Sequence, residues 1–388
     1  MPLKCSGYNV LTGELVVVEG ERGITSVEPW LGSGNVPLSA RTWLAPGFID
    51  LQVNGFAGVD YCAGTATLEQ LAHSLRAQFA TGVTRLLPTV ITGSQAVMEQ
   101  ALRRLAEAKD QLPEGEAIEG FHVEGPYISP EDGPRGAHPL AAVRPPNLDE
   151  YRRWQEAARG QVKLITLSPE WPGAIPFIEA IVREGVVAAI GHTKADAAQI
   201  AAAVRAGATL STHLGNGAHA VLARHPNYLW DQLAEDRLSA SFIVDGIHLG
   251  ESFLKAAVRA KGAERSVLIT DAVMPALCPP GDYRLGEVDV TLHPPGDRVT
   301  LRGSSRLAGS ALRMDHAIGN LVRMTGLSLR EAVTMATINP ARAGRVSGRT
   351  RGLTPGEKAD VVEFQWDAER RCLTVQRTWL AGQLVYQA

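Results

Sequence analysis

The chain has 388 residues, of which 45% are hydrophobic and 20% are charged, a composition typical of an ordinary soluble globular protein. A chain of this length can form one large domain and a small one. The formal net charge is -3 and no long run of one sign occurs, so the composition does not favour binding to nucleic acid or to an anionic membrane. An anionic substrate would need a local cationic pocket.

The cysteines and the hydropathy pattern bear on the cellular compartment. Cys5, Cys62, Cys278 and Cys372 are widely scattered and form no CxxC motif. In a chain this long they indicate free thiols of a reducing compartment rather than a disulfide framework. The first residues, MPLKCSGYNV, contain no apolar signal core, and no stretch approaches the ~20 apolar residues of a membrane span. We therefore expect a cytoplasmic protein.

The two ends of the chain share one pattern. Residues 1–43 read as short strands and turns followed by a Gly/Ser/Pro stretch, LGSGNVPLSA, and residues 346–388 alternate apolar and polar residues with period two. Neither end could bury a core alone. We expect them to combine into a small antiparallel β-sandwich domain, which requires the two chain ends to lie close together.

Between these ends, residues 44–345 repeat a strand followed by an amphipathic helix. The candidate strands are Phe48–Val53, Val83–Thr89, Ala117–Glu124, Val162–Ser168, Val186–His192, Thr209–His213, Ser239–Asp245 and Ser266–Asp271. Eight such units predict an α/β fold of the (β/α)₈ TIM-like barrel type. An open, doubly wound sheet is the alternative. A segment rich in Pro and Gly, residues 275–309, predicts a hairpin insertion before the last helix, and a short helix is expected near Leu229–Ala234.

Four polar residues follow apolar runs at the ends of predicted strands. Glu124, His192, His213 and Asp271 end the runs AIEGFHVEG, VVAAIGHT, TLSTHLGN and SVLITDA. In a closed barrel the carboxyl ends of the strands form one rim, so these side chains should converge there. Two imidazoles and one carboxylate with an open fourth position suit a single catalytic divalent metal ion, most often zinc, with iron, manganese or cobalt as less selective alternatives.

Each of these residues also has a purely structural interpretation. A lone histidine after a strand is more often a core residue, but two on neighbouring strand ends in Gly/Thr/Ser-rich contexts favour a metal site. His122 shares the face of Glu124 and is more compatible with a hydrogen-bonding residue beneath the metal than with a ligand. Asp271 alone would be interpreted as a helix cap or salt-bridge partner. Beside a metal site it becomes a candidate general base and acid.

Ten segments in family order span nearly the whole chain and resemble one family. They are APGFIDLQVNG, FHVEGPYISP, RGAH, GHTKA, THLGNGA, IVDGIHL, LITDA, LAGSALRM, ATINPARAG and GLTPGEKADVVEF. The chain resembles the amidohydrolase superfamily and, within it, the N-acetylglucosamine-6-phosphate deacetylases. The resemblance implies metal-dependent hydrolysis of the N-acetyl group of N-acetylglucosamine 6-phosphate in amino-sugar catabolism or cell-wall recycling.

One departure from the superfamily pattern concerns the metal. Many amidohydrolases carry His-x-His after the first strand, whereas this chain has Gln52-Val53-Asn54. Amides lack the imidazole lone pairs that a second transition metal prefers. The resemblance therefore implies the single-metal branch, with one ion held by Glu124, His192 and His213. Gln52 and Asn54 would touch bound water or substrate, or would simply form hydrogen bonds within the loop.

The resemblance also assigns residues to the substrate. Ala137 and His138 in RGAH match a substrate-contacting segment in which the histidine steadies the developing oxyanion. The residues that match the remaining substrate-binding positions are Asn216, Gly217, Arg224 and His248 for the phosphate, and Leu307, Ala308 and Gly309 for a loop over the sugar. In relatives the arginine comes from a neighbouring subunit, which implies a homodimer; a solvated surface arginine is the alternative for Arg224.

Two other functions remain open from the sequence. One is a different amidohydrolase that acts on cyclic amides or N-acyl amino acids; the missing His-x-His and the lack of a lysine in LITLSPE count against it. The other is a non-catalytic metal-binding relative. The presence of Asp271 together with all three proposed ligands counts against that function.

Overall fold

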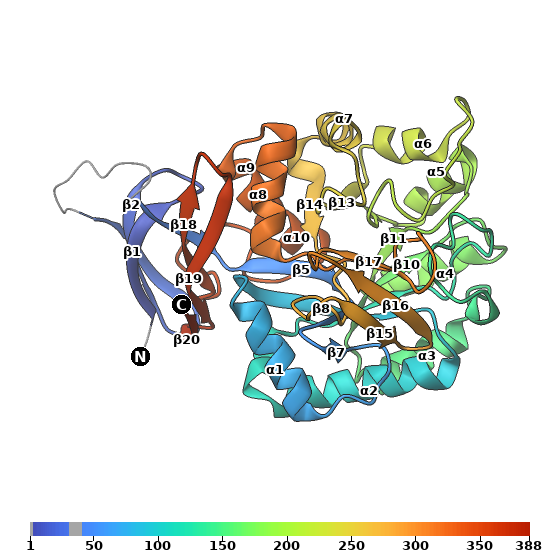
Figure 1. Cartoon of the computed structure of the whole chain (residues 1–388), viewed down its shortest axis with the longest axis horizontal. Helices are drawn as coiled ribbons and strands as arrows, with labels where there is room; N and C mark the ends of the chain where they lie inside the picture. Colours follow the sequence, from blue (N-terminus) through green and yellow to red (C-terminus); the bar gives the residue numbers. More distant parts are fainter. Residues whose placement is uncertain (1–2, 31–40) are drawn as a thin grey trace.

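The large domain is a parallel barrel, as the computed structural model shows for residues 3–30 and 41–388 (Figure 1). Its strands are β5 (Phe48–Val53), β8 (Val83–Ile91), β9 (Phe121–Glu124), β10 (Val162–Leu167), β11 (Val187–Ile190), β12 (Leu210–Ser211), β13 (Ser239–Ile243) and β14 (Ser266–Ile269). They pair in this order, and a parallel bridge between Val53 and Ala272 joins the last strand to the first. The predicted barrel is confirmed and the open sheet is excluded.

Helices cover the outside of this barrel because parallel strands must be buried on both faces. They are α1 (Leu68–Phe79), α2 (Gln95–Gln111), α3 (Leu148–Ala157), α4 (Ala174–Arg183), α5 (Ala197–Arg205), α6 (Tyr228–Ala234), α7 (Glu251–Lys261), α8 (Met314–Thr325), α9 (Leu329–Ala336) and α10 (Ile338–Ala343). Thr67, Asp196 and Ser328 begin three of them with complete capping boxes. The expected short helix near Leu229–Ala234 is α6.

The strand boundaries differ from those expected at both ends. Ala117 lies in a 3₁₀ turn (Pro113–Ala117), so this strand, β9, begins at Phe121 rather than at Ala117. At the other end, His192, His213 and Asp271 lie two residues beyond β11, β12 and β14. Each of the three has a positive φ, 49°, 31° and 49°. The chain therefore leaves the ladder in a left-handed conformation that non-glycine residues adopt at an energetic cost.

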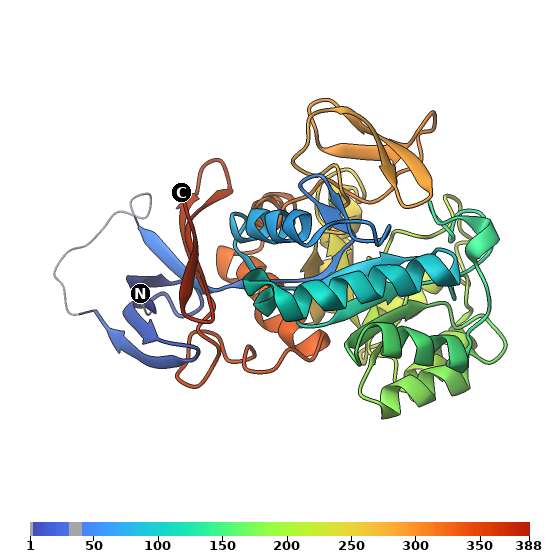
Figure 2. The same ribbon diagram turned by 90° about the horizontal axis from the view of Figure 1, so that it is seen from below.

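Strands from both ends of the chain form the small domain (Figures 1 and 2). One seven-stranded sheet has the order β20-β19-β18-β4-β1-β2-β3. Its strands are β1 (Leu3–Asn9), β2 (Leu15–Gly20), β3 (Ile24–Pro29), β4 (Thr42–Pro46), β18 (Val361–Asp367), β19 (Cys372–Leu380) and β20 (Gln383–Gln387). Buried side chains from the β1–β3 half and from β4, β18 and β19 pack into one small core, so the two halves of the sheet face each other as in a sandwich.

The pairing in this domain corrects one expectation. β1 and β4 are parallel, through Tyr8↔Trp43 and Asn9↔Leu44, whereas an antiparallel arrangement was expected throughout. β2 is antiparallel to both β1 and β3, so β3 runs in the direction of β1, and β4 runs in that direction too instead of continuing the alternation. The Gly/Ser/Pro stretch 31–40 lies outside the described residues. β4 spans the expected boundary between residues 43 and 44, and the division into domains at that point stays a prediction.

The expected hairpin insertion has a third strand. β15 (Gly281–Leu285), β16 (Val288–His293) and β17 (Arg298–Leu301) form an antiparallel sheet that stands over one end of the barrel (Figures 1 and 2). β15 has a mostly exposed sequence, GDYRL, without the apolar alternation that marks the other two strands. A short ribbon, β6 (Gly55–Phe56) and β7 (Val59–Asp60), follows the first barrel strand.

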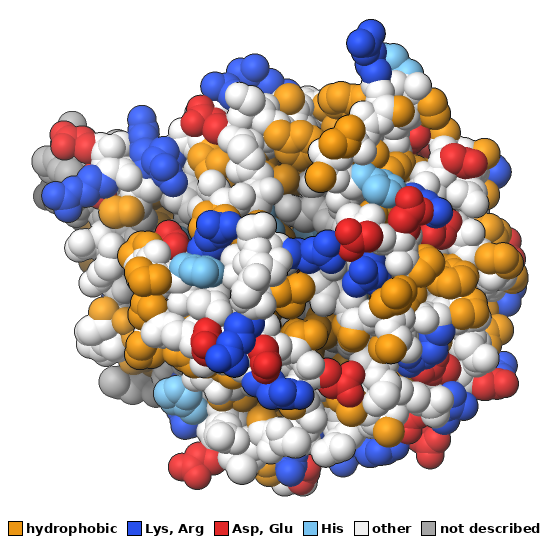
Figure 3. Space-filling view, turned by 45° about the vertical axis from the view of Figure 1, so that its right-hand side comes forward, with side chains coloured by type: hydrophobic (Ala, Val, Ile, Leu, Met, Phe, Trp, Pro, Cys, Tyr) orange, Lys and Arg blue, Asp and Glu red, His pale blue; other side chains and the backbone are white. Residues whose placement is uncertain are grey.

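The surface and the helices agree with the composition. Acidic and basic side chains are interspersed over the face that Figure 3 presents, without a large patch of one sign. Among the described residues, no helix is both long and apolar enough to cross a bilayer.

Candidate active site

A cavity of about 510 Å³ opens at the carboxyl-terminal rim of the barrel. Its walls come from the ends of several strands, from the loop 136–138, and from the insertion over the rim. The sequence-predicted residues that line it are Asn54, Glu124, Ala137, His138, His192, His213, Asn216, Gly217, His248, Asp271, Leu307, Ala308 and Gly309. These thirteen residues, separated by up to 255 positions, thus meet in one cavity. Strand-end placement predicted this for Glu124, His192, His213 and Asp271, and the family resemblance implied the other nine.

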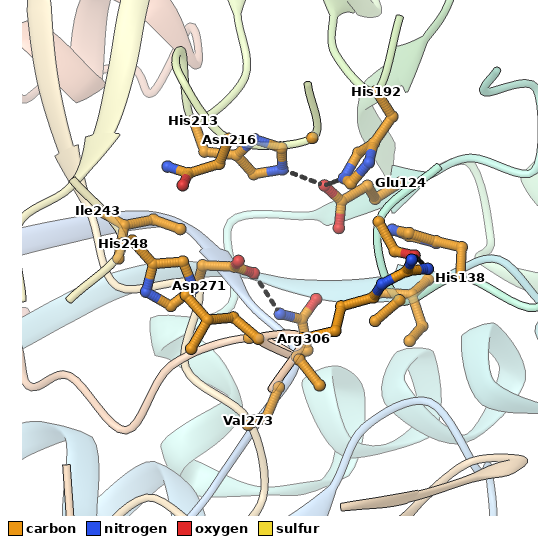
Figure 4. Close-up of a pocket in the computed structure, with 18 of the residues that line it drawn as sticks. Glu124, His138, His192, His213, Asn216, Ile243, His248, Asp271, Val273 and Arg306 are labelled. Carbon is orange, nitrogen blue, oxygen red and sulfur yellow. Dashed lines mark hydrogen bonds and ion pairs between the residues drawn. The ribbon is translucent and has the colours of Figure 1, made fainter. Parts of the chain in front are cut away.

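Glu124, His192 and His213 converge on one point of this cavity (Figure 4). The Nε2 atoms of His192 and His213 lie 3.2 Å and 2.7 Å from the same carboxylate oxygen, Oε1 of Glu124. The candidate ligand atoms all lie within 4.8 Å of one another. The convergence of three buried side chains from three strands is the geometry expected of a metal site.

The tautomer of His192 shows that these residues fit a cation. Its Nδ1 lies 2.8 Å from the carbonyl oxygen of Pro134, which can only accept, so Nδ1 carries the proton. In the neutral ring Nε2 then has a bare lone pair, and this lone pair faces a carboxylate oxygen. A bound cation removes that repulsion, and a backbone acceptor behind the ring is the usual support of a metal-binding histidine.

Burial and the neighbouring charged groups shift the pKa values of this cluster in opposite directions. Burial alone would raise the pKa of Glu124, but hydrogen bonds and charge from the protonated forms of His192 and His213 hold that pKa well below its ordinary value. For His213, burial lowers the pKa, and the hydrogen bond and charge of Glu124 raise it by more. Nδ1 of His213 is buried and has no hydrogen-bond partner among the described residues. The carboxylate is therefore ionised and available to a cation.

Asp271 faces the cluster from the last barrel strand (Figure 4). Its Oδ1 accepts hydrogen bonds from Asn54 Nδ2 at 2.6 Å and from Gln52 Nε2 at 3.2 Å. Burial and the charge of Glu124 raise the pKa of Asp271 to about 6. A carboxylate with this pKa can both take and return a proton near neutral pH.

The two hydrogen bonds to Asp271 show which group the side chains of Gln52 and Asn54 contact. Both amides hold the Asp271 carboxylate, and Asn54 also lines the cavity, whereas Gln52 is not among the lining residues. The sequence offered water, substrate or hydrogen bonds within the loop for these amides and did not anticipate Asp271. Oδ1 of Asn54 is buried without a partner among the described residues, so this amide still has one acceptor for a ligand.

The other two histidines near the cluster differ in their roles. His122 has both ring nitrogens engaged, Nδ1 with the Leu51 carbonyl oxygen at 3.1 Å and Nε2 with Thr166 Oγ1 at 2.7 Å. It is thus a hydrogen-bonding residue, as the sequence favoured. His138 has only Nδ1 engaged, with Thr92 Oγ1 at 2.8 Å, and its ring packs edge-on against His192. Burial lowers the pKa of His138 to about 3, so the ring is neutral.

A polar corner of the cavity contains three of the four residues that the sequence connected with phosphate, namely Asn216, Gly217 and His248. His248 Nδ1 is 2.5 Å from Asp245 Oδ2, and this contact orients the ring. Asn216 Nδ2 is buried and unpartnered among the described residues. Gly217 has a φ of 57°, and a Cβ there would lie 2.7 Å from Nδ1 of His192, so only glycine fits. The corner offers unsatisfied donors to an anion.

Three residues of the insertion's last segment close the opposite side. Leu307, Ala308 and Gly309 line the cavity, and Gly309 has a φ of 67°. A Cβ at Gly309 would lie 2.4 Å from a methyl group of Val273. This close packing holds the segment against the strand end that carries Asp271.

Arg224 lies apart from the cavity of its own chain. Its side chain is exposed in the loop before α6, and it is absent from the residues that line the cavity. A role in a partner's site stays a prediction.

The structure also brings Arg306 to the cavity, a residue that the sequence reasoning missed. Thr92 and Asp245, which orient His138 and His248, were missed as well; only Asp245 had a local signal, its place in DGIH.

The sequence of residues 43–385 matches the model of the Amidohydrolase family. The chain belongs to this family. It is 36% identical over 96% of its length to an N-acetylgalactosamine-6-phosphate deacetylase of Shewanella sp., of which the match covers 90%. It is 31% identical over 94% of its length to the N-acetylglucosamine-6-phosphate deacetylase of Bacillus subtilis, again covering 90% of that protein.

A solved structure agrees with this membership. The crystal structure of N-acetyl-D-glucosamine-6-phosphate deacetylase from Mycobacterium smegmatis superposes with a TM-score of 0.84 at 31% identity and covers 96% of each chain. An amidohydrolase requires a metal ion, and the Glu124, His192 and His213 cluster can hold one. The non-catalytic interpretation loses its support, because the similar proteins along the whole chain are hydrolases.

Proposed function

We propose that this amidohydrolase removes the acetyl group from N-acetylglucosamine 6-phosphate and releases glucosamine 6-phosphate and acetate. The observation that carries the proposal is the buried carboxylate of Asp271, held by Asn54 and Gln52, opposite a cluster of three side chains that fits one cation. The polar corner at Asn216 and His248 supports recognition of the phosphate. Similarity to deacetylases of amino-sugar phosphates supports the substrate class.

An amide is a poor electrophile and its amine is a poor leaving group, so both ends of the bond need assistance. Glu124, His192 and His213 would hold a divalent cation, which when bound would polarise the carbonyl and lower the pKa of water from about 16 to about 7. We infer zinc, because two imidazoles and a carboxylate are among its usual catalytic ligands. Asp271 takes a proton from the attacking water and delivers it to the departing nitrogen.

His138 completes the set as a neutral hydrogen-bond donor. The Thr92 hydroxyl lies 2.8 Å from Nδ1 of His138 and 3.3 Å from the Glu124 carbonyl oxygen. In this structure the hydroxyl donates to the Glu124 carbonyl oxygen, so it can donate to Nδ1 only after turning away from that carbonyl. We propose this turn for the substrate complex, in which the proton of the ring then lies on Nε2 and is donated to the carbonyl oxygen of the substrate as negative charge develops there. The low pKa of the ring keeps its charge state constant during the reaction.

The phosphate binds at the polar corner in this proposal. Asn216, the backbone of Gly217 and His248 supply donors from one chain. The exposed position of Arg224 is compatible with a guanidinium reaching the site of a second copy, which supports a homodimer with shared sites. A fork of two N–H groups suits phosphate oxygens.

Four free thiols, Cys5, Cys62, Cys278 and Cys372, support a cytoplasmic location.

N-Acetylgalactosamine 6-phosphate is the second candidate substrate, because two similar proteins at 34% and 36% identity bear the name of that activity. The test is an acetate-release assay on both epimers, with and without a chelator, beside a panel of cyclic amides and N-acyl amino acids. We expect chelator-sensitive release with the higher kcat/KM on the glucosamine epimer. A preference for the galactosamine epimer would select the second candidate, and activity on the panel alone would contradict both.

A further inference from the structure

Two loops face each other across the mouth of the cavity. One is the segment 130–138, which carries His138; the other is the segment 298–310, which runs from β17 to the strand end of Asp271. The side chain of Arg306 reaches from the second loop to the first. We propose that Arg306 is a positioning residue that fastens these loops together and so fixes His138 and Asp271 on opposite sides of the substrate.

The guanidinium of Arg306 makes two contacts with the facing loop. Nη2 lies 2.8 Å from Asp132 Oδ1, and Nη1 donates to the carbonyl oxygen of Gly136 at 3.1 Å. Figure 4 shows the Arg306 side chain extending across the cavity toward His138. The planar guanidinium binds the carboxylate and the carbonyl through two separate nitrogens in a fixed fork, whereas a lysine would have to reach both acceptors from one nitrogen.

On the far side, these contacts lead to His138 and His192. Arg135 shares the Asp132 carboxylate at 3.1 Å and donates to the carbonyl oxygen of His138 at 2.9 Å. Gly136 has a φ of 61° and lies flat on the His192 ring, where a Cβ would be 3.1 Å from Cε1. A displacement of the Arg306 contact would therefore move both the neutral donor and one candidate metal ligand.

On the near side, a backbone ladder leads to Asp271. Leu301 N donates to Arg306 O at 2.8 Å, and Ala308 N donates to Val299 O at 3.2 Å. Ser310 N then donates to the carbonyl oxygen of Asp271 at 2.9 Å. Arg306 is thus four residues from Ser310, whose backbone N–H is hydrogen-bonded directly to the proposed base.

The exposure of the pair sets the strength of this fastening. The side chains of Arg306 and Asp132 are 37% and 68% exposed, so solvent and salt screen their attraction. A pair of this kind changes an equilibrium by roughly two- to fivefold. It is strong enough to favour the closed arrangement of the loops and weak enough to release at each turnover.

The first test measures backbone motion without using activity. Hydrogen exchange of the metal-loaded protein is compared for the wild type, Arg306→Ala, Arg306→Lys and the control Arg302→Ala. Arg302 pairs with Asp282 in the same sheet at 3.2 Å and does not line the cavity. We expect Arg306→Ala to speed exchange of amides in 133–138 by roughly two- to fivefold. Arg306→Lys should have an intermediate effect, and Arg302→Ala should have none. Unchanged exchange in 133–138 would overturn the proposal.

The second test uses the proposed deacetylase activity and therefore depends on that function. If Arg306 positions the loops, Arg306→Ala should lower kcat/KM by a similar factor for N-acetylglucosamine 6-phosphate and for unphosphorylated N-acetylglucosamine. A loss confined to the phosphorylated sugar would mean direct phosphate binding and would overturn the positioning role. If the wild type proves inactive on both sugars, the proposed function fails, and the exchange experiment still decides on the fastening.

Discussion

Two buried charged clusters, at opposite ends of the barrel, differ in how completely their charges and polar atoms are paired. At the amino-terminal end, Asp360 lies between Arg85 and Arg349, with Arg85 Nε 2.7 Å from its Oδ2 and the backbone N of Ala381 2.8 Å from its Oδ1. At the rim, within the described part of the chain, the ion-pair partners of Glu124 are His192 and His213, and Asp271 forms no ion pair with an arginine or lysine. In the first cluster both oxygens of the carboxylate have partners within the protein, whereas the second cluster leaves polar groups available to a ligand.

Unsatisfied atoms and strained backbone separate the two clusters further. Among the described residues, the rim cluster includes the buried, unpartnered atoms Nδ1 of His213, Oδ1 of Asn54 and Nδ2 of Asn216. His192, His213 and Asp271 all have positive φ. No atom of the Asp360 cluster is in the unpartnered group. Buried polar groups without partners cost stability, so their concentration at one end indicates ligand binding there.

The largest expected effect comes from neutralising the proposed base at the rim. Asp271→Asn should lower kcat by about 10²–10⁴-fold, because the amide cannot accept a proton from water. The free energy of unfolding should stay close to that of the wild type or rise, since burial disfavours the carboxylate. Steady-state kinetics, metal analysis and urea unfolding measure the three quantities. Near-normal turnover at full metal content would exclude the proton-transfer role.

The same chemical change at the other cluster should act on stability instead. Asp360→Asn leaves two buried guanidinium groups without their carboxylate and should cost about 3–5 kcal/mol of unfolding free energy. Burial raises the pKa of Asp360, but the charges of Arg349 and Arg85 lower it to about 2. Its contribution is therefore present above the ordinary aspartate pKa of about 3.9 and is lost as the pH falls toward 2.

The exposed Asp297, in the turn between β16 and β17, is a matched control for Asp360. Asp297→Asn should change the unfolding free energy by no more than about 0.5 kcal/mol. Urea unfolding near neutral pH measures both variants. An equally small effect of Asp360→Asn would show that the Asp360 cluster does not stabilise the fold.

A smaller effect is expected from the proposed contribution of a partner's arginine. Arg224→Ala should raise KM for N-acetylglucosamine 6-phosphate by about 10–100-fold, the size of one or two charged hydrogen bonds, with little change for the unphosphorylated sugar. Its neighbour in the same loop, His225, provides the control His225→Ala. Equal changes of KM for both sugars would remove Arg224 from the phosphate site.

The smallest effect concerns the pH profile. Asp271 must be ionised to act as a base, and burial and Glu124 raise its pKa to about 6. A cation at the rim opposes that rise, so the acidic limb of kcat/KM should fall at or below pH 6. Activity should decline by about tenfold per pH unit below the limb. A limb well above pH 6 in metal-loaded enzyme would point to a different base.

Strand-end position was enough to predict the rim cluster, because short apolar runs and the strand–helix repeat are local properties of the sequence. Glu124, His192, His213 and Asp271 were found in this way before any tertiary contact was known. The same reasoning failed for β15, whose exposed residues carry no apolar alternation, and for the parallel pairing of β1 with β4. It also placed Gln52 and Asn54 near water or substrate and missed their bonds to Asp271.

The sequence by itself determined the strand–helix repeat, the polar residues at its strand ends and the strands at both chain ends, and it favoured a barrel over an open sheet. Only the tertiary structure decided which polar groups bind each other. Asn54 and Asp271 are 217 residues apart, and Arg306 and Gly136 are 170 apart. Contacts of that range depend on barrel closure and on the path of the insertion, which local periodicity does not encode. They select the tautomers, pKa values and loop contacts on which the chemistry depends.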